Sequence, residues 1–94
     1  MYRIKISPKA KSDIKYAKIY YEDKQAGLGL AFVKNVILQI NELQDKTVEH
    51  KISFDTIRRV FVKRFPYVVY YERIDNENLI VIVAVLHDKQ EKDF

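Results

Sequence analysis

The chain has 94 residues, of which 48% are hydrophobic and 32% charged, and its formal net charge is +4. This balance excludes an intrinsically disordered protein and predicts one small domain over residues 1–94. The absence of cysteine excludes disulfide frameworks and thiolate chemistry. No stretch is apolar for long enough to act as a signal peptide or to cross a bilayer, so we expect a cytoplasmic protein with no membrane partner.

The first half of the chain predicts a strand and two helices. Residues 2–6 alternate apolar and basic side chains, as in a short half-buried strand. Ser7-Pro8 predicts the start of a helix, because serine caps helices and proline fits their first position. We expect this helix to end in a C-cap at Gly27 and a second helix to cover 28–43, which makes the pair an antiparallel hairpin. The predicted apolar stripes are Ala10, Ile14, Ala17 and Tyr21 in the first helix, and Phe32, Val33, Val36, Ile37, Ile40 and Leu43 in the second.

The second half predicts a sheet. After a polar region with a short edge strand expected at 50–53, strands are predicted at 57–64, 67–74 and 79–87. The last strand is apolar along both faces, which predicts a central strand covered on both sides. The fold class is therefore α+β, with a helical hairpin packed on a small, mostly antiparallel sheet in two layers, in the order β-α-α-β-β-β. The residues expected in or near the core are Ile14, Phe32, Val36, Ile40, Val81 and Val83.

Familiar catalytic motifs are absent from the sequence. It has no glycine-rich phosphate loop, no cysteine pair and no HExxH, and two histidines without cysteine make poor metal ligands, so we expect no metal and no cofactor. No serine is predicted beside His50 or His87, which argues against a nucleophilic triad. His87, at the end of the last strand, is the one candidate general acid or base. The alternative is a polar strand end with a hydrogen-bonded ring.

Cations and tyrosines gather in the second half of the chain. On the sheet face away from the helices they would form a patch suited to phosphate contact and base stacking. The alternative is that the cations are simply solvated and that the tyrosines are there because strands favour them. The candidate partner or nucleic-acid surface comprises Arg58, Arg59, Lys63, Arg64, Tyr67, Tyr71, Arg73 and Lys89.

Several short segments resemble the toxins of the RelE/ParE family in order and spacing. They include Arg64-Phe65-Pro66-Tyr67, the pair Tyr70-Tyr71 and the closing Ala84-Val85-Leu86-His87, preceded by Ile6-Ser7-Pro8-Lys9-Ala10, Tyr20-Tyr21-Glu22, Gly27-Leu28-Gly29 and Phe32-Val33. The resemblance covers nearly the whole chain. It implies a helical hairpin on one side of a curved sheet, and a growth-inhibiting, plasmid-stabilising toxin that a co-expressed antitoxin keeps inactive.

The family has two branches with different chemistry. RelE-type members cut messenger RNA in the ribosome with cations and an acid–base group on the sheet, whereas ParE-type members inhibit DNA gyrase and have no established hydrolytic site. His87 matches a histidine of some nuclease members, but Pro66-Tyr67 stands where they usually carry arginine, and only Arg59, Lys63 or Arg64 could replace it. The resemblance therefore favours a ParE-like gyrase inhibitor that is not an enzyme. The alternatives are a ribosome-dependent mRNA endonuclease and a non-toxic protein-interaction domain.

Overall fold

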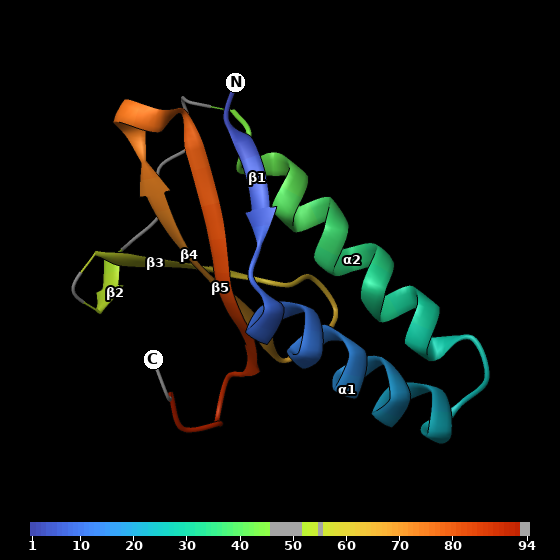
Figure 1. The fold of residues 1–94 in the computed structure, drawn as a ribbon. Coiled ribbons are helices and arrows are strands. Elements are labelled where there is room, and N and C mark those ends of the chain that lie inside the picture. Colours follow the sequence, from blue (N-terminus) through green and yellow to red (C-terminus); the bar gives the residue numbers. More distant parts are fainter. Residues whose placement is uncertain (46–51, 55, 93–94) are drawn as a thin grey trace.

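The computed structural model describes residues 1–45, 52–54 and 56–92. Both helices lie on one side of a curved sheet (Figure 1), so the predicted two-layer α+β fold is confirmed. The elements are β1 (Arg3–Ile6), α1 (Pro8–Lys24), α2 (Leu28–Glu42), β2 (Ile52–Phe54), β3 (Ile57–Phe61), β4 (Tyr67–Ile74), the 3₁₀ turn η1 (Asp75–Glu77) and β5 (Leu79–His87).

The sheet has the strand order β1-β5-β4-β3-β2. β1 runs parallel to β5 and the other neighbours are antiparallel, so the sheet is mostly antiparallel and β5 is central, as predicted. The expected edge strand near 50–53 is found as β2 at Ile52–Phe54, while the position of His50 lies outside the described residues. Among the described residues, no helix has the length and apolar character needed to span a membrane.

Local signals explain the ends of the two helices. The Ser7 hydroxyl accepts a hydrogen bond from the Ala10 N–H at 3.1 Å, which caps α1 as predicted. Gly27 adopts the left-handed conformation (φ 89°), but as the N-cap of α2. The predicted C-cap role is therefore wrong, because α1 already ends at Lys24. Gly29 brings the helices together, since a Cβ there would lie 2.6 Å from the carbonyl oxygen of Lys18.

The main core lies between the helices and the sheet. Phe32, Val36 and Ile40 of α2 are at most 2% exposed and Ile14 packs against them, as predicted. The strand residues that meet them are Ile80 and Ile82. The predicted pair Val81 and Val83 is half-buried and absent from this core, and Ile37 is 38% exposed. Because β5 is apolar on both faces, its sequence could not indicate which face meets the helices.

A β-bulge divides β5 into two parts. Tyr70 pairs with Ala84 and Tyr71 pairs with Ile82, which leaves Val83 as the extra residue. Before the bulge Ile82 faces the helices, and after it Val85 does. The opposite face carries a separate buried cluster, which we call the far-face cluster: Val68, Tyr70, Ala84 and Leu86, with Ile57 and Val83 packed against it.

Candidate functional site

The residues predicted to form one surface patch are divided between the two faces of the sheet. Tyr71 is 2% exposed within the core beneath the helices, so its assignment to a surface is wrong. Tyr67 also faces the helices and packs against that core. Arg58 stands opposite Tyr71 in the β3–β4 register and therefore shares its face. Only Arg59, opposite Tyr70, lies on the face away from the helices.

Arg73, a further arginine of the predicted patch, has a structural role. Arg73 follows Tyr71 by two residues in β4 and so shares its face. Its Nε lies 3.3 Å from a carboxylate oxygen of Asp75, and its guanidinium lies 5.9 Å from the ring centre of Tyr2. With only 16% of its side chain exposed, Arg73 holds η1 against the sheet and offers little to a partner.

The three remaining cations stand in turns. Lys63 and Arg64 are exposed between β3 and β4, where Arg64 adopts a left-handed backbone (φ 74°) and the Lys63 carbonyl accepts from Asn35 Nδ2 at 3.0 Å. Lys89 is exposed just after β5. These side chains are available to a partner.

His87 ends β5 opposite Tyr67, with the two ring centres 5.4 Å apart. Its Nδ1 accepts the Lys89 N–H at 3.1 Å, which leaves the proton of the neutral ring on Nε2. Asp88 Oδ1, 3.1 Å from the same nitrogen, becomes a partner only when the ring is protonated. His87 therefore lies on the helix side of the sheet, and Arg59 lies on the other side.

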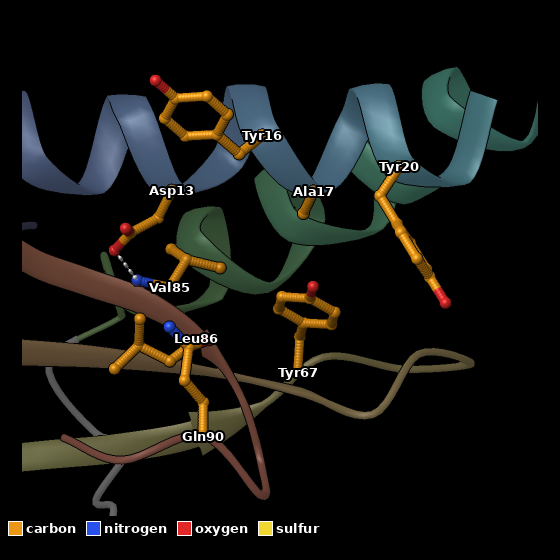
Figure 2. Close-up of a pocket in the computed structure, with 8 residues that line it drawn as sticks. All are labelled: Asp13, Tyr16, Ala17, Tyr20, Tyr67, Val85, Leu86 and Gln90. Carbon is orange, nitrogen blue, oxygen red and sulfur yellow. Dashed lines mark hydrogen bonds between the residues drawn. The ribbon is translucent and has the colours of Figure 1, made fainter. Parts of the chain in front are cut away.

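A groove lies between α1 and the adjoining ends of β4 and β5. It has one hollow of about 250 Å³ and a second of about 420 Å³. Both hollows include Tyr20 and Tyr67, so we call the whole the tyrosine groove. Figure 2 shows the first hollow, with the Tyr20 side chain extending down from α1 and the Tyr67 hydroxyl pointing up toward the helix. The first is lined by Asp13, Tyr16, Ala17, Tyr20, Tyr67, Val85, Leu86 and Gln90, and the second by Tyr20, Tyr21, Lys24, Leu28, Pro66, Tyr67 and His87.

The contribution of α1 to the groove was missed from the sequence. Tyr16, Ile19 and Tyr20 are 71%, 48% and 52% exposed, and they lie off the apolar stripe that packs in the core. Their spacing of three and four residues is that of a second apolar stripe on the same helix. That second stripe was the available signal.

Two tyrosines of the groove, Tyr67 and Tyr21, have raised pKa values. Burial raises the pKa of Tyr67, and the neighbouring Tyr20 and Asp13 raise it further. Burial likewise raises the pKa of Tyr21, with added contributions from Tyr67 and Tyr20. Neutral phenol rings present apolar faces and a hydroxyl donor.

The far face has a different chemical character. Its centre is the far-face cluster, and Tyr70 in it is only 1% exposed. Cations stand around it: the ammonium of Lys92 lies 5.7 Å from the Tyr70 ring centre, and the guanidinium of Arg59 lies 5.7 Å from that of the exposed Phe61. Nowhere in the described part of the chain do three or more metal-binding side chains of histidine, cysteine, aspartate or glutamate come together.

Comparison with known proteins identifies the family. The family described as "ParE toxin of type II toxin-antitoxin system, parDE" matches residues 4–92. The chain belongs to the ParE toxin family. No curated protein matches it by sequence.

Solved structures agree with the ParE fold. The chromosomal ParDE toxin–antitoxin system from P. aeruginosa is similar with a TM-score of 0.80 and 18% identity, over 93% of this chain and 96% of that one. The intact E. coli RelBE toxin–antitoxin complex is similar with a TM-score of 0.59 and 13% identity, over 98% of this chain and 100% of that one. The predicted position in the RelE/ParE family, nearer the ParE branch, is confirmed.

Proposed function

We propose that this ParE-family chain is the toxin of a type II toxin–antitoxin pair, that it acts in the cytoplasm by binding DNA gyrase, and that a cognate antitoxin neutralises it. Membership of the family supports the toxin role. One observation favours gyrase over messenger RNA as the target: His87 and Arg59 lie on opposite faces of the sheet.

Cutting RNA without a metal requires a base for the 2′-hydroxyl, an acid for the leaving oxygen and a cation on the same phosphate. His87, which lines the groove, is separated from Arg59 by the thickness of the sheet, and the centre of the far face is apolar. An inhibitor that acts by binding needs only a shaped surface, and the tyrosine groove with its neighbouring cations supplies one.

Two assays on one preparation test the target. The purified chain should block gyrase supercoiling or trap gyrase on cleaved DNA, and should leave ribosome-bound messenger RNA intact. The variants His87→Ala and Arg59→Ala are assayed beside it. RNA cleavage that disappears in the His87→Ala variant would overturn the gyrase proposal and support the nuclease.

A growth experiment tests the toxin role itself. Induction should arrest growth, and co-expression of the small acidic or ribbon-helix-helix protein that we expect to be encoded beside the gene should restore it. A chain that causes no growth defect and inhibits neither target would be a non-toxic interaction domain.

A further inference from the structure

We propose that two copies of this chain associate in solution through the outer side of α2. Leu38 of each copy inserts between side chains of the other, and Lys34 of each copy pairs with Glu42 of the other. This association goes beyond the proposed function and does not depend on it. Three features support it: an exposed row of side chains on α2, a hollow beside that row, and the order of the charges along it.

The exposed row lies on the side of α2 that is turned away from the core. Lys34, Leu38 and Glu42 are all exposed, and Leu38 is 57% exposed. Their spacing of four residues places them in one line along the helix. A single exposed leucine is common on protein surfaces, so the surroundings of Leu38 decide whether it can serve as a contact.

A hollow of about 270 Å³ lies beside Leu38. Four of its lining residues come from α2, namely Asn35, Leu38, Gln39 and Glu42, and Lys63 of the β3–β4 turn completes it. The four are residues i, i+3, i+4 and i+7 of one helix. In knobs-into-holes packing, four neighbouring side chains of this kind receive one side chain of a facing helix. The hollow therefore has the form that accepts an apolar side chain from a second helix.

Hydrogen bonds hold the walls of the hollow in place. The Asn35 Nδ2 donates to the Lys63 carbonyl at 3.0 Å, and the Gln39 Nε2 donates to a carboxylate oxygen of Glu42 at 2.6 Å. Gln39 is only 7% exposed. Because these side chains are already ordered, filling the hollow costs little further side-chain entropy.

A second copy of the chain supplies both the apolar side chain and the matching charges. Lys34 stands four residues before Leu38, and Glu42 stands four residues after it. When two α2 helices pack antiparallel about a two-fold axis at Leu38, Lys34 of one copy therefore lies opposite Glu42 of the other, and this pair occurs twice.

The charges also select this register over its neighbours. A shift of one helical turn in either direction would set a charged side chain against Leu38, and a parallel pairing would set Lys34 against its own copy. The chain carries a net charge of +4, so two copies repel each other in most orientations. The outer side of α2 is a surface on which opposite charges can meet.

The proposed contact is small and leaves the tyrosine groove of each copy open. The residues that line the hollow at Leu38 do not line either hollow of the groove. A single pair of 15-residue helices buries less surface than the roughly 1,200–2,000 Å² that is typical of a stable complex. We therefore expect a dissociation constant of the order of 100 µM, so that monomer and dimer coexist.

Sedimentation velocity of the full chain at low salt, from about 10 µM to about 1 mM, tests the association. Leu38→Asp should weaken it by more than about tenfold, the effect of losing a central contact. The matched control is Ile19→Asp on α1, a 48% exposed position outside the contact, which should change it by less than about twofold.

Exchange of the two charges tests the register. Lys34→Glu and Glu42→Lys should each weaken the association by about threefold to tenfold, because each sets like charges opposite one another twice. The chain that carries both substitutions restores opposite charges and should return to within about twofold of the wild type. Glu42→Lys also removes the acceptor of Gln39, so the melting temperature of each variant is measured beside its association.

Cross-linking tests the contact without disturbing either charge. The chain has no cysteine, so Leu38→Cys introduces one thiol per copy, and the two thiols lie beside each other at the two-fold axis. Mild oxidation with diamide should convert this variant to a covalent dimer at a concentration where Ile19→Cys stays monomeric.

Three results would overturn the association through α2. The first is a wild-type chain that stays monomeric at about 1 mM. The second is a dimer that persists in Leu38→Asp, or one that the double charge exchange fails to restore. The third is a monomeric wild type whose Leu38→Asp variant loses binding to the antitoxin, which would assign this side of α2 to the antitoxin instead.

Discussion

The two faces of the sheet have different roles. The helix face carries the main core, and where α1 diverges from the sheet it opens into the tyrosine groove. Neither α1 nor α2 lies over the far face, which buries a smaller cluster around Tyr70. The apolar centre of the far face shows that a domain of this size can bury side chains on both sides of one strand.

The largest expected effect concerns the core of the helix face. Phe32→Ala should lower the free energy of unfolding by about 3–5 kcal/mol, because a fully buried ring leaves a cavity. Urea denaturation measures this change. The control on the same helix is Ile37→Ala, a 38% exposed position that should cost below about 1 kcal/mol. Equal losses in the two variants would contradict the core described here.

A matched pair in β4 compares the two faces directly. Val69 faces the helices and Val68 faces away, and both are at most 2% exposed. We expect Val69→Ala to cost about 2–3 kcal/mol and Val68→Ala about 1–2 kcal/mol, because the smaller cluster can close around the lost methyl groups. A greater cost at Val68 would mean that the far face is the better packed of the two.

A smaller effect is expected where α1 meets the open edge of β5. Asp13→Ala removes the acceptor of the Val85 N–H, and an unsatisfied amide at a part-buried site costs about 1–2 kcal/mol. Asp13→Asn keeps an acceptor oxygen and should cost less. Thermal unfolding and hydrogen exchange at the Val85 amide measure the two variants. An amide of Val85 that exchanges no faster in Asp13→Ala would show that this hydrogen bond is unimportant.

The smallest effect is a dependence of stability on alkaline pH. Burial raises the pKa of Tyr67 and Tyr21 above the ordinary 10.0, so above that pH the unfolded chain loses these protons before the folded chain does. Below the pKa that these tyrosines have in the unfolded chain, their contribution to the stability of the fold is complete. It is lost as the pH rises through the higher pKa that they have in the folded chain. Melting temperatures should therefore fall as the pH rises above about 10, and less steeply for Tyr67→Phe. An unchanged slope in that variant would exclude Tyr67 as a cause.

Elements with strong local signals could be predicted from the sequence. The Ser7-Pro8 start of α1 and the bounds of the last two strands agree with the structure. The strand predicted at 57–64 ends at Phe61, because the following turn places Arg64 in a left-handed conformation. Such a conformation is uncommon for a residue other than glycine, so no composition signal marked it.

The site was harder to predict, for a physical reason. Sequence alternation assigns residues to faces only while a strand stays regular, and the bulge at Val83 ends that regularity within an apolar run. Tyr71 was assigned to a surface although it is buried in the core, because β4 carries apolar and aromatic residues on both faces and its sequence does not indicate which face meets the helices. The groove also depends on α1 and the end of β5 meeting in space. The second apolar stripe of α1 marks an exposed apolar surface, but no local pattern indicates which strand end lies beside it.

The bulge has a consequence for comparing this chain with its relatives. Counted in steps of two from Ile80, an unbulged β5 would turn His87 toward the face that carries Arg59, instead of toward Tyr67. Two relatives aligned without a gap along this strand can therefore hold a histidine in the same column and on opposite sides of the protein. Whether two such histidines descend from one catalytic residue should therefore be judged from the pairing of the strands. It should not be judged from the fact that both sequences have histidine at the aligned position.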